Sequence, residues 1–424
     1  MTCLTSNHGS ISVMWKTVSE ACNLACDYCY YSRCGGKPSQ INRIDEGILE
    51  KFIKEYMALS NGVAKFAWQG GEPLLAGLDF FEKVVELQAK YAPPHTMISN
   101  SLQTNGTLLN DEWASFLKKY NFLVGVSLDG PKEINDARRV TGSGTGSFER
   151  VMRGIEFLRK YQVDFNILSV IHENNVGKAK ELMDFYEQEK FTFVQFIPCM
   201  DFRAQETEAK GEYLITPNQY GAFLCEAFDV WYNDGHPNTS VRFFDNMLNV
   251  YVHREAELCV HRKSCPKILI LEQNGDAYPC DFFINDQYKI GNVGNDSLED
   301  ILNSPVYQEF LKLKPNLPKQ CHSCEFIDLC HGGCPRNRTW SFGEDETLVD
   351  VDYFCQSYKQ IYSYAHERMK IVANNVKQRW LEEYLNTGLK LPNRNDICIC
   401  GSGKKFKKCC EPIQMAIGGK IKRN

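Results

Sequence analysis

The chain lacks the features that mark membrane and exported proteins. No apolar run approaches the roughly 18 to 20 residues that a membrane-spanning helix needs, and the mean hydropathy is -0.38. Its first residues, MTCLTSNHGSISVMWK, contain no charged segment followed by an apolar one, so we expect no secretory signal peptide. We therefore expect a cytoplasmic protein that makes no membrane contact.

Net charge is also low, at -5 for 424 residues. This balance gives no global electrostatic reason for binding nucleic acid or a membrane surface. The length suggests roughly two to three domains. The sequence shows no long internal repeat and no low-complexity segment.

Cysteine, in contrast, is abundant, with 19 residues. Disulfides are one interpretation, typical of secreted proteins. The odd number, the missing export signal and the short spacing within clusters favour metal binding instead.

The first half of the chain alternates apolar, β-branched runs with segments whose apolar residues recur every three or four positions, as in helices. This alternation predicts an α/β fold with a parallel sheet and right-handed crossovers. Six units are too few for an eight-fold barrel, which leaves a partial (β/α)6 barrel or an open sheet, with its active edge where the strands end. Asn110, Ser147 and Asn174 are predicted helix N-caps. The six runs cover residues 11–18, 64–69, 96–104, 122–128, 163–171 and 191–197.

Beyond the alternating half, the sequence predicts a β-hairpin turning at Asn274-Gly275 and a long helix over 358–384. The predicted domains are a partial barrel, a connecting helical segment, a small α+β cysteine-rich domain, a helix with linker, and a tail. Their predicted bounds are 1–215, 216–257, 258–375, 376–392 and 393–424.

The first cysteine cluster lies in CNLACDYCY, residues 22–30. Cys22, Cys26 and Cys29 have the spacing C-x3-C-x2-C, with Tyr28 before the last. Closed zinc sites and complete iron–sulfur ligand sets use four ligands, so three thiolates leave one metal position open. The motif resembles that of the radical S-adenosylmethionine (SAM) superfamily. This resemblance implies a 4Fe–4S cluster that binds SAM and cleaves it to a 5′-deoxyadenosyl radical. A zinc knuckle with a distant fourth ligand is the alternative.

The same resemblance implies a set of SAM contacts at the ends of the predicted strands. Tyr28 belongs to the cysteine motif, two residues belong to the QGGEP segment, two would hold the ribose and the carboxylate, and one lies near adenine. Each residue also has an ordinary role open to it, as a turn, a cap, a solvated charge or core packing. The residues are Tyr28, Gly71, Glu72, Ser127, Arg139 and Met200.

A second group of cysteines resembles the SPASM domain, an auxiliary-cluster module of peptide-modifying radical SAM enzymes. The resemblance implies two further 4Fe–4S clusters, each closed by four protein ligands; two zinc sites are the alternative. The ligand sets would interleave. The first set is Cys259, Cys265, Cys280 and Cys334, and the second is Cys321, Cys324, Cys330 and Cys355.

The stretches FAWQGGEPLLAGLDFFE, NSLQTNGTLL, FLVGVSLDGPKEI and YPCDFF, followed by this array, resemble anaerobic sulfatase-maturating enzymes. The resemblance implies oxidation of a cysteine or serine to Cα-formylglycine, in a Cys/Ser-x-Pro-x-Arg type motif of an unfolded sulfatase polypeptide. The radical would abstract the Cβ hydrogen, and the auxiliary clusters would accept an electron. It also implies an electron donor such as flavodoxin or ferredoxin. Gln69 and Tyr31 are candidates for lining the substrate pocket.

Asp281 matches the proposed general base of that family. An ordinary carboxyl pKa of about 3.9 is far below a thiol pKa of about 8.5, so deprotonation before hydrogen abstraction is unfavourable. We expect Asp281 to take the proton only after a radical forms on the neighbouring carbon. A hairpin aspartate that bonds its own turn is the alternative.

The tail, CICGSGKKFKKCC, resembles the SEC-C zinc motif, with Cys398, Cys400, Cys409 and Cys410 as implied ligands. Its lysines would dock the translation or export machinery, or would form a solvated face. Catalysis should survive removal of the tail. The remaining cysteines are interpreted as free thiols: Cys3, Cys34, Cys199 and Cys225.

Two other functions stay open. A SPASM enzyme that forms thioether crosslinks in a peptide would share all the clusters and differ in its product. A non-catalytic, metal-stapled binding protein would produce no deoxyadenosine from SAM and a reductant.

Overall fold

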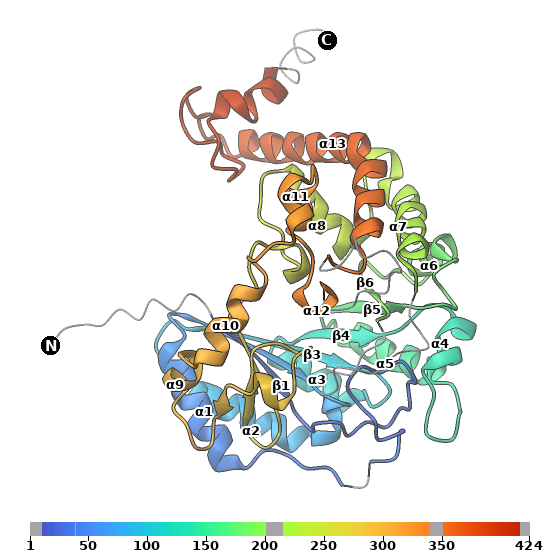
Figure 1. Ribbon diagram of the computed structural model, residues 1–424, viewed down its shortest axis with the longest axis vertical. Coiled ribbons are helices and arrows are strands. Elements are labelled where there is room, and N and C mark those ends of the chain that lie inside the picture. Colours follow the sequence, from blue (N-terminus) through green and yellow to red (C-terminus); the bar gives the residue numbers. More distant parts are fainter. Residues whose placement is uncertain (1–10, 39, 201–214, 339–350, 416–424) are drawn as a thin grey trace, which may run out of the picture. The chain divides into compact units, whose positions relative to one another are not determined.

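The computed structural model describes residues 11–38, 40–200, 215–338 and 351–415 (Figure 1). The chain forms two compact units. The first contains Met1–Val176, Gln195–Ile215 and Ser264–Asn316, and the second contains Gly177–Val194, Thr216–Lys263 and Leu317–Asn424.

The first unit is built on a parallel sheet. Its central order, β1-β2-β3-β4-β5, follows the chain. β6 (Phe193–Pro198) begins in the second unit, where it pairs in parallel with the short β7 (Ser240–Val241). All six predicted strands are confirmed. The five central strands are β1 (Ser12–Lys16), β2 (Val63–Gln69), β3 (Met97–Thr104), β4 (Leu123–Ser127) and β5 (Phe165–Ile171).

Helices of the first unit lie together on one face of this sheet (Figure 1). Large aromatic side chains fill the space between them. Trp15 of β1 stacks on Trp68 of β2 with ring centroids 6.0 Å apart. Phe52 and Phe81 meet these rings edge-on at 5.2 and 5.6 Å, an arrangement that aromatic pairs favour. The helices are α1 (Glu46–Leu59), α2 (Leu78–Tyr91), α3 (Asp111–Lys119), α4 (Lys132–Arg138) and α5 (Phe148–Lys160).

The predicted helix caps have different outcomes. Asn110 caps α3, since its side chain accepts from the Trp113 backbone N–H at 2.9 Å. Ser147 stands at the start of α5 without a side-chain capping bond. The prediction for Asn174 is wrong, because α6 (Ala179–Gln188) begins beyond it. The intervening turn is held by Asn175, whose side chain accepts from the His172 N–H at 2.8 Å.

The predicted hairpin is confirmed as β8 (Ile268–Leu271) and β9 (Asp276–Tyr278), which are antiparallel. Gly275 in the turn has φ 86°, a backbone conformation that glycine adopts without strain. Unexpectedly, β8 also pairs in parallel with β1, and β10 (Gly291–Asn292) extends the edge beyond β9. The hairpin therefore continues the main sheet and brings the residues after β9 close to the end of β1. Two short helices follow it, α9 (Leu298–Leu302) and α10 (Pro305–Leu313).

The second unit is helical. α7 (Pro217–Tyr232) packs along α13 (Cys355–Asn386), where Asp229 forms an ion pair with Arg368 at 2.6 Å. The expected helical stretch and long helix are therefore confirmed. The other helices are α8 (Arg242–Tyr251), α11 (Ile327–Cys330) and α12 (Pro335–Arg338). Short 3-10 helices in the two units are η1 (Pro73–Ala76), η2 (Asn233–Gly235), η3 (Cys259–His261), η4 (Asp286–Tyr288), η5 (Lys319–Ser323) and η7 (Phe406–Lys408).

Within the described ranges, none of the helices combines the length and the apolar character needed to span a membrane.

Candidate functional site

The N-terminal cysteines lie on the loop that follows β1. Cys22, Cys26 and Cys29 line a hollow of about 910 Å³, together with Gly71 at the end of β2. Burial raises the pKa of Cys22 well above its ordinary value and that of Cys26 to about 12. These thiols therefore keep their protons until a metal replaces them. Three cysteines on one open hollow, of which Cys22 is buried and Cys26 and Cys29 are half-buried, fit an iron–sulfur cluster with one position left for another ligand.

The segment after β2 is bound tightly to the cysteine loop. The Gly71 N–H donates to the Ser19 carbonyl at 2.7 Å, and the Glu72 N–H donates to the Ala21 carbonyl at the same distance. A Cβ at Gly71 would lie 2.0 Å from the Ala21 oxygen, so the close approach of these backbones requires glycine.

The Glu72 side chain faces the protein interior. It accepts from the Leu74 N–H at 3.1 Å, the Thr104 hydroxyl at 2.7 Å and the Asn105 N–H at 2.7 Å. Burial raises the pKa of Glu72 to about 7 against the opposing effect of these bonds. Its carboxylate thus ties the ends of β2 and β3 together.

Two predicted SAM contacts, Arg139 and Tyr28, are brought together by a residue that sequence reasoning missed. Asp129, which is fully buried, accepts from Arg139 Nη2 at 3.0 Å and from the Tyr28 hydroxyl. Its Oδ1 also accepts from the Val170 N–H at 3.0 Å. The Arg139 guanidinium lies 5.5 Å from the centroid of the Tyr28 ring. The available signal was SLDGP, a polar segment at the end of a predicted strand.

The two remaining predicted contacts lie at the same edge of the sheet. Ser127 ends β4 and accepts from Gln103 Nε2 at 3.0 Å. Met200 follows β6 and is buried. Its neighbour Cys199 donates its N–H to the Ile171 carbonyl at 2.8 Å.

Asp281 lies beside the cysteine loop. One oxygen forms an ion pair with Lys16 of β1, and Oδ2 accepts from the Tyr30 hydroxyl at 2.6 Å. Gln69 Nε2 donates to the same Tyr30 oxygen at 3.3 Å, and burial followed by the Asp281 charge raises the Tyr30 pKa. The described contacts of Asp281 thus run to β1 and to the cysteine loop, which favours the proton-acceptor interpretation over a turn residue.

Tyr31 lines a second, open hollow of about 1050 Å³. Its hydroxyl donates to Glu272 at 2.7 Å, and Lys16 Nζ lies 4.4 Å from its ring centroid. Burial raises the pKa of Glu272, against the effects of Tyr31 and Lys16. Lys16 was not singled out from the sequence, although it connects Asp281 with this hollow.

Cys34, interpreted above as a free thiol, contacts the backbone of Cys22. The Cys22 N–H donates to Cys34 Sγ at 3.3 Å, and Cys34 Sγ donates to the Cys22 carbonyl at 3.1 Å. It therefore fixes the backbone that presents the first predicted ligand.

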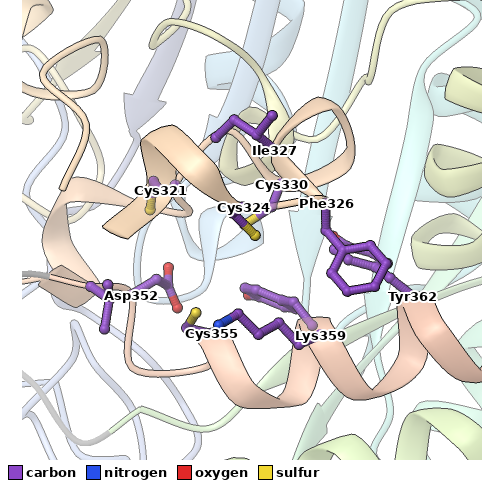
Figure 2. Close-up of a pocket in the computed structure, with 12 residues that line it drawn as sticks. Cys321, Cys324, Phe326, Ile327, Cys330, Asp352, Cys355, Lys359 and Tyr362 are labelled. Carbon is purple, nitrogen blue, oxygen red and sulfur yellow. The ribbon is translucent and has the colours of Figure 1, made fainter. Parts of the chain in front are cut away.

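In the second unit, Figure 2 shows four cysteines around one hollow of about 370 Å³. They are Cys321, Cys324, Cys330 and Cys355, the second predicted SPASM set. Burial raises the pKa of Cys355 to about 11. Apolar and aromatic side chains, including Phe326 and Tyr362, form much of the remaining lining. The donor set fits an iron–sulfur cluster with four protein ligands.

The first SPASM set is divided between the units. Cys265 and Cys280 belong to the first unit, where burial and then these two thiols raise the pKa of Tyr307. Cys259 and Cys334 belong to the second, where the Cys334 N–H donates to Asp352 Oδ2 at 2.7 Å.

The four tail cysteines converge. The sulfur atoms of Cys398, Cys400, Cys409 and Cys410 all lie within 4.8 Å of one another, which fits a tetrahedral zinc site. The group packs with Leu381 near the end of α13.

Family profiles match three parts of the chain. The Radical SAM superfamily profile matches residues 17–186. An iron-sulfur cluster-binding domain, SPASM, matches residues 265–325, and the SEC-C motif matches residues 394–412. SAM and iron–sulfur clusters are therefore cofactors of this chain.

Curated relatives cover nearly the whole chain. A cysteine-type anaerobic sulfatase-maturating enzyme of Clostridium perfringens is 37% identical over 371 residues, which span 87% of this chain and 99% of the relative. A serine-type enzyme of Bacteroides thetaiotaomicron is 34% identical over 395 residues, or 89% of this chain and 95% of the relative.

Solved structures show similarity to the same family. Native anSMEcpe with bound AdoMet and Cp18Cys peptide is 38% identical, with a TM-score of 0.79 over 87% of this chain and 100% of that one. Streptococcus suis SuiB bound to its precursor peptide SuiA has a TM-score of 0.57 at 16% identity, over 81% of this chain and 74% of that one, a similarity of fold.

Proposed function

The chain belongs to the anaerobic sulfatase-maturating enzymes of the radical SAM superfamily, and on that premise we propose that it converts a cysteine or serine of an unfolded sulfatase segment to Cα-formylglycine. The segment would carry a Cys/Ser-x-Pro-x-Arg type motif. The observation that carries the proposal is the position of Asp281, bonded to Tyr30 of the cysteine loop and paired with Lys16.

Residues of the first unit would hold SAM and the first cluster. Cys22, Cys26 and Cys29 would bind the first cluster. Arg139, fixed by Asp129, would face the SAM carboxylate, and Ser127 would contact the ribose. When bound, SAM and this cluster supply abstraction of the Cβ hydrogen atom of the target residue.

Asp281 would then accept the S–H or O–H proton of the target, while one electron leaves toward an auxiliary cluster. Hydrogen atom, proton and electron together make up the two-electron oxidation. A cysteine target gives a thioaldehyde that loses sulfide on hydrolysis, and a serine target gives the aldehyde directly. Tyr30 and Lys16 orient the carboxylate, since each holds one of its oxygens.

The auxiliary clusters would use the two interleaved SPASM sets. One comprises Cys321, Cys324, Cys330 and Cys355, which line a single hollow. The other comprises Cys259, Cys265, Cys280 and Cys334. A low-potential donor such as flavodoxin or ferredoxin would supply electrons, and the tail would bind zinc.

The test is anaerobic. Reconstituted protein, SAM and dithionite are mixed with two peptides that differ only in cysteine or serine at the target position, and products are measured by mass spectrometry. Formation of an aldehyde supports the proposal and identifies the preferred target. A thioether crosslink without aldehyde would instead establish the peptide-crosslinking alternative.

A further inference from the structure

The hollow formed by the second SPASM set contains a positive charge. Lys359 lies one helical turn after Cys355 on α13, so the two side chains share a face of the helix. Figure 2 shows the Lys359 nitrogen turned into the hollow beside Cys355.

This amine has no acidic neighbour close enough to neutralise it among the described residues. Asp352 also lines the hollow, but its carboxylate accepts from the N–H groups of Cys334 and Phe354 at 2.7 and 2.8 Å, and from Asn337 Nδ2 at 3.1 Å. None of the ion pairs found among the described residues involves Lys359. Its charge is therefore directed at the thiols.

A positive charge beside bound thiolates favours the more negative, reduced form of the cluster that they hold. The surrounding side chains are mostly apolar, which weakens dielectric screening and lengthens the reach of the charge.

We infer that the charge of Lys359 raises the reduction potential of one auxiliary cluster and so makes that cluster a better electron acceptor. The cluster is the one held by Cys321, Cys324, Cys330 and Cys355. Nearby charge and hydrogen bonds to sulfur are established determinants of such potentials. The inference rests on the ligand set given under the proposed function.

The experiment is a redox titration of the full-length chain, followed by electron paramagnetic resonance. Cys22, Cys26 and Cys29 are replaced by alanine, so that only auxiliary clusters contribute to the spectrum. Lys359→Gln should lower the midpoint potential of one cluster by about 59 mV, which is a tenfold change in a one-electron equilibrium. Lys359→Arg, which keeps the charge, should restore the potential.

A matched control removes another lysine from the same helix. Lys370 pairs with Glu367 at 2.8 Å and does not line the hollow, so Lys370→Gln should leave both midpoints unchanged. With the first cluster intact, Lys359→Gln should also reduce the yield of formylglycine per deoxyadenosine several-fold.

The experiment distinguishes a failure of the inference about Lys359 from a failure of the proposed ligand set. Full iron content with an unshifted midpoint in Lys359→Gln overturns the inference alone, as does an equal shift in Lys370→Gln. Loss of the cluster in both Lys359→Gln and Lys359→Met, with retention in Lys370→Gln, would make Lys359 a support for assembly and also overturn it. If the unsubstituted chain holds too little iron for two auxiliary clusters, the ligand assignment itself is wrong.

Discussion

Tyr30 donates a hydrogen bond of 2.6 Å to Asp281, a residue 251 positions further along the chain. The bond joins the loop of the first cysteine cluster to the segment that follows the hairpin β8–β9. Its geometry depends on the parallel pairing of β8 with β1, which aligns Ser12 with Ile268. Sheet topology thus places the proposed proton acceptor beside the loop that would hold the first cluster.

Replacing Asp281 by asparagine tests the proposed base. Asparagine retains the shape of the side chain but cannot take a proton at neutral pH, so formylglycine should fall at least a hundredfold, a typical loss for a general base. Production of deoxyadenosine should persist, because the predicted SAM contacts do not include Asp281. Both products are measured in one anaerobic assay. The control is Asp276→Asn, which changes an aspartate of the hairpin that precedes Asp281 and breaks its 2.7 Å ion pair with Lys289. An equal loss of formylglycine in this control would remove Asp281 from the mechanism.

Lys16→Met should destabilise the first unit. Lys16 is fully buried and pairs with Asp281, so its loss leaves a partly buried carboxylate without its counter-charge. We expect a loss on the order of 2 kcal/mol in the free energy of unfolding. Adding Asp281→Asn should recover part of it, and a double-mutant cycle measures that coupling. Strictly additive losses would show that the ion pair does not stabilise the fold.

Asp129→Asn should weaken SAM binding. Asparagine cannot provide two anionic oxygens to Arg139 and Tyr28, so both should lose their fixed orientation. A charge-assisted hydrogen bond contributes about 1.5–3 kcal/mol, which predicts at least a tenfold rise in the Kd for SAM. Equilibrium binding to anaerobically reconstituted enzyme without a reductant, which does not cleave SAM, measures it. Asp245→Asn, which changes a half-buried aspartate bonded to Ser240 in the second unit, should leave SAM affinity unaltered.

Local patterns in the sequence predicted the strands, the long helix and the hairpin, because periodicity and turn residues record local backbone preference. The pairing of β8 with β1 was not predictable in this way, since it joins segments far apart in sequence whose apolar faces suit several neighbours. For the same reason, only part of the candidate site was predictable from the sequence. Cysteine spacing identified the candidate ligands, but Asp129 and Lys16 gain their roles from partners on other elements.

Glu72 should make stability depend on pH. Its pKa rises from 4.5 to about 7 on folding because of burial, so the folded state binds the proton more tightly than the unfolded chain. The free energy of unfolding should therefore fall as pH increases from about 4.5 to about 7, by on the order of 2 kcal/mol. Glu72→Gln removes this dependence, so the stability of the variant should rise relative to that of the unsubstituted protein as pH increases. Denaturation of both SAM-free proteins between about pH 5.5 and 7.5 gives the direction of the pH dependence. If the free energies of unfolding of the two proteins changed in parallel with pH, the prediction would be contradicted.

The tail should be separable from catalysis. Its four cysteines converge on one another and pack with Leu381 and Trp380 near the end of α13, so bound zinc would hold this small core together. Replacing Cys398 and Cys409 by serine should remove one equivalent of zinc and expose Trp380, which a red shift of its fluorescence would report. Iron content and formylglycine formation from a short peptide should stay within about twofold of the original values, a free-energy change below 0.5 kcal/mol. A large loss of activity with unchanged iron would show instead that the tail helps to present the substrate.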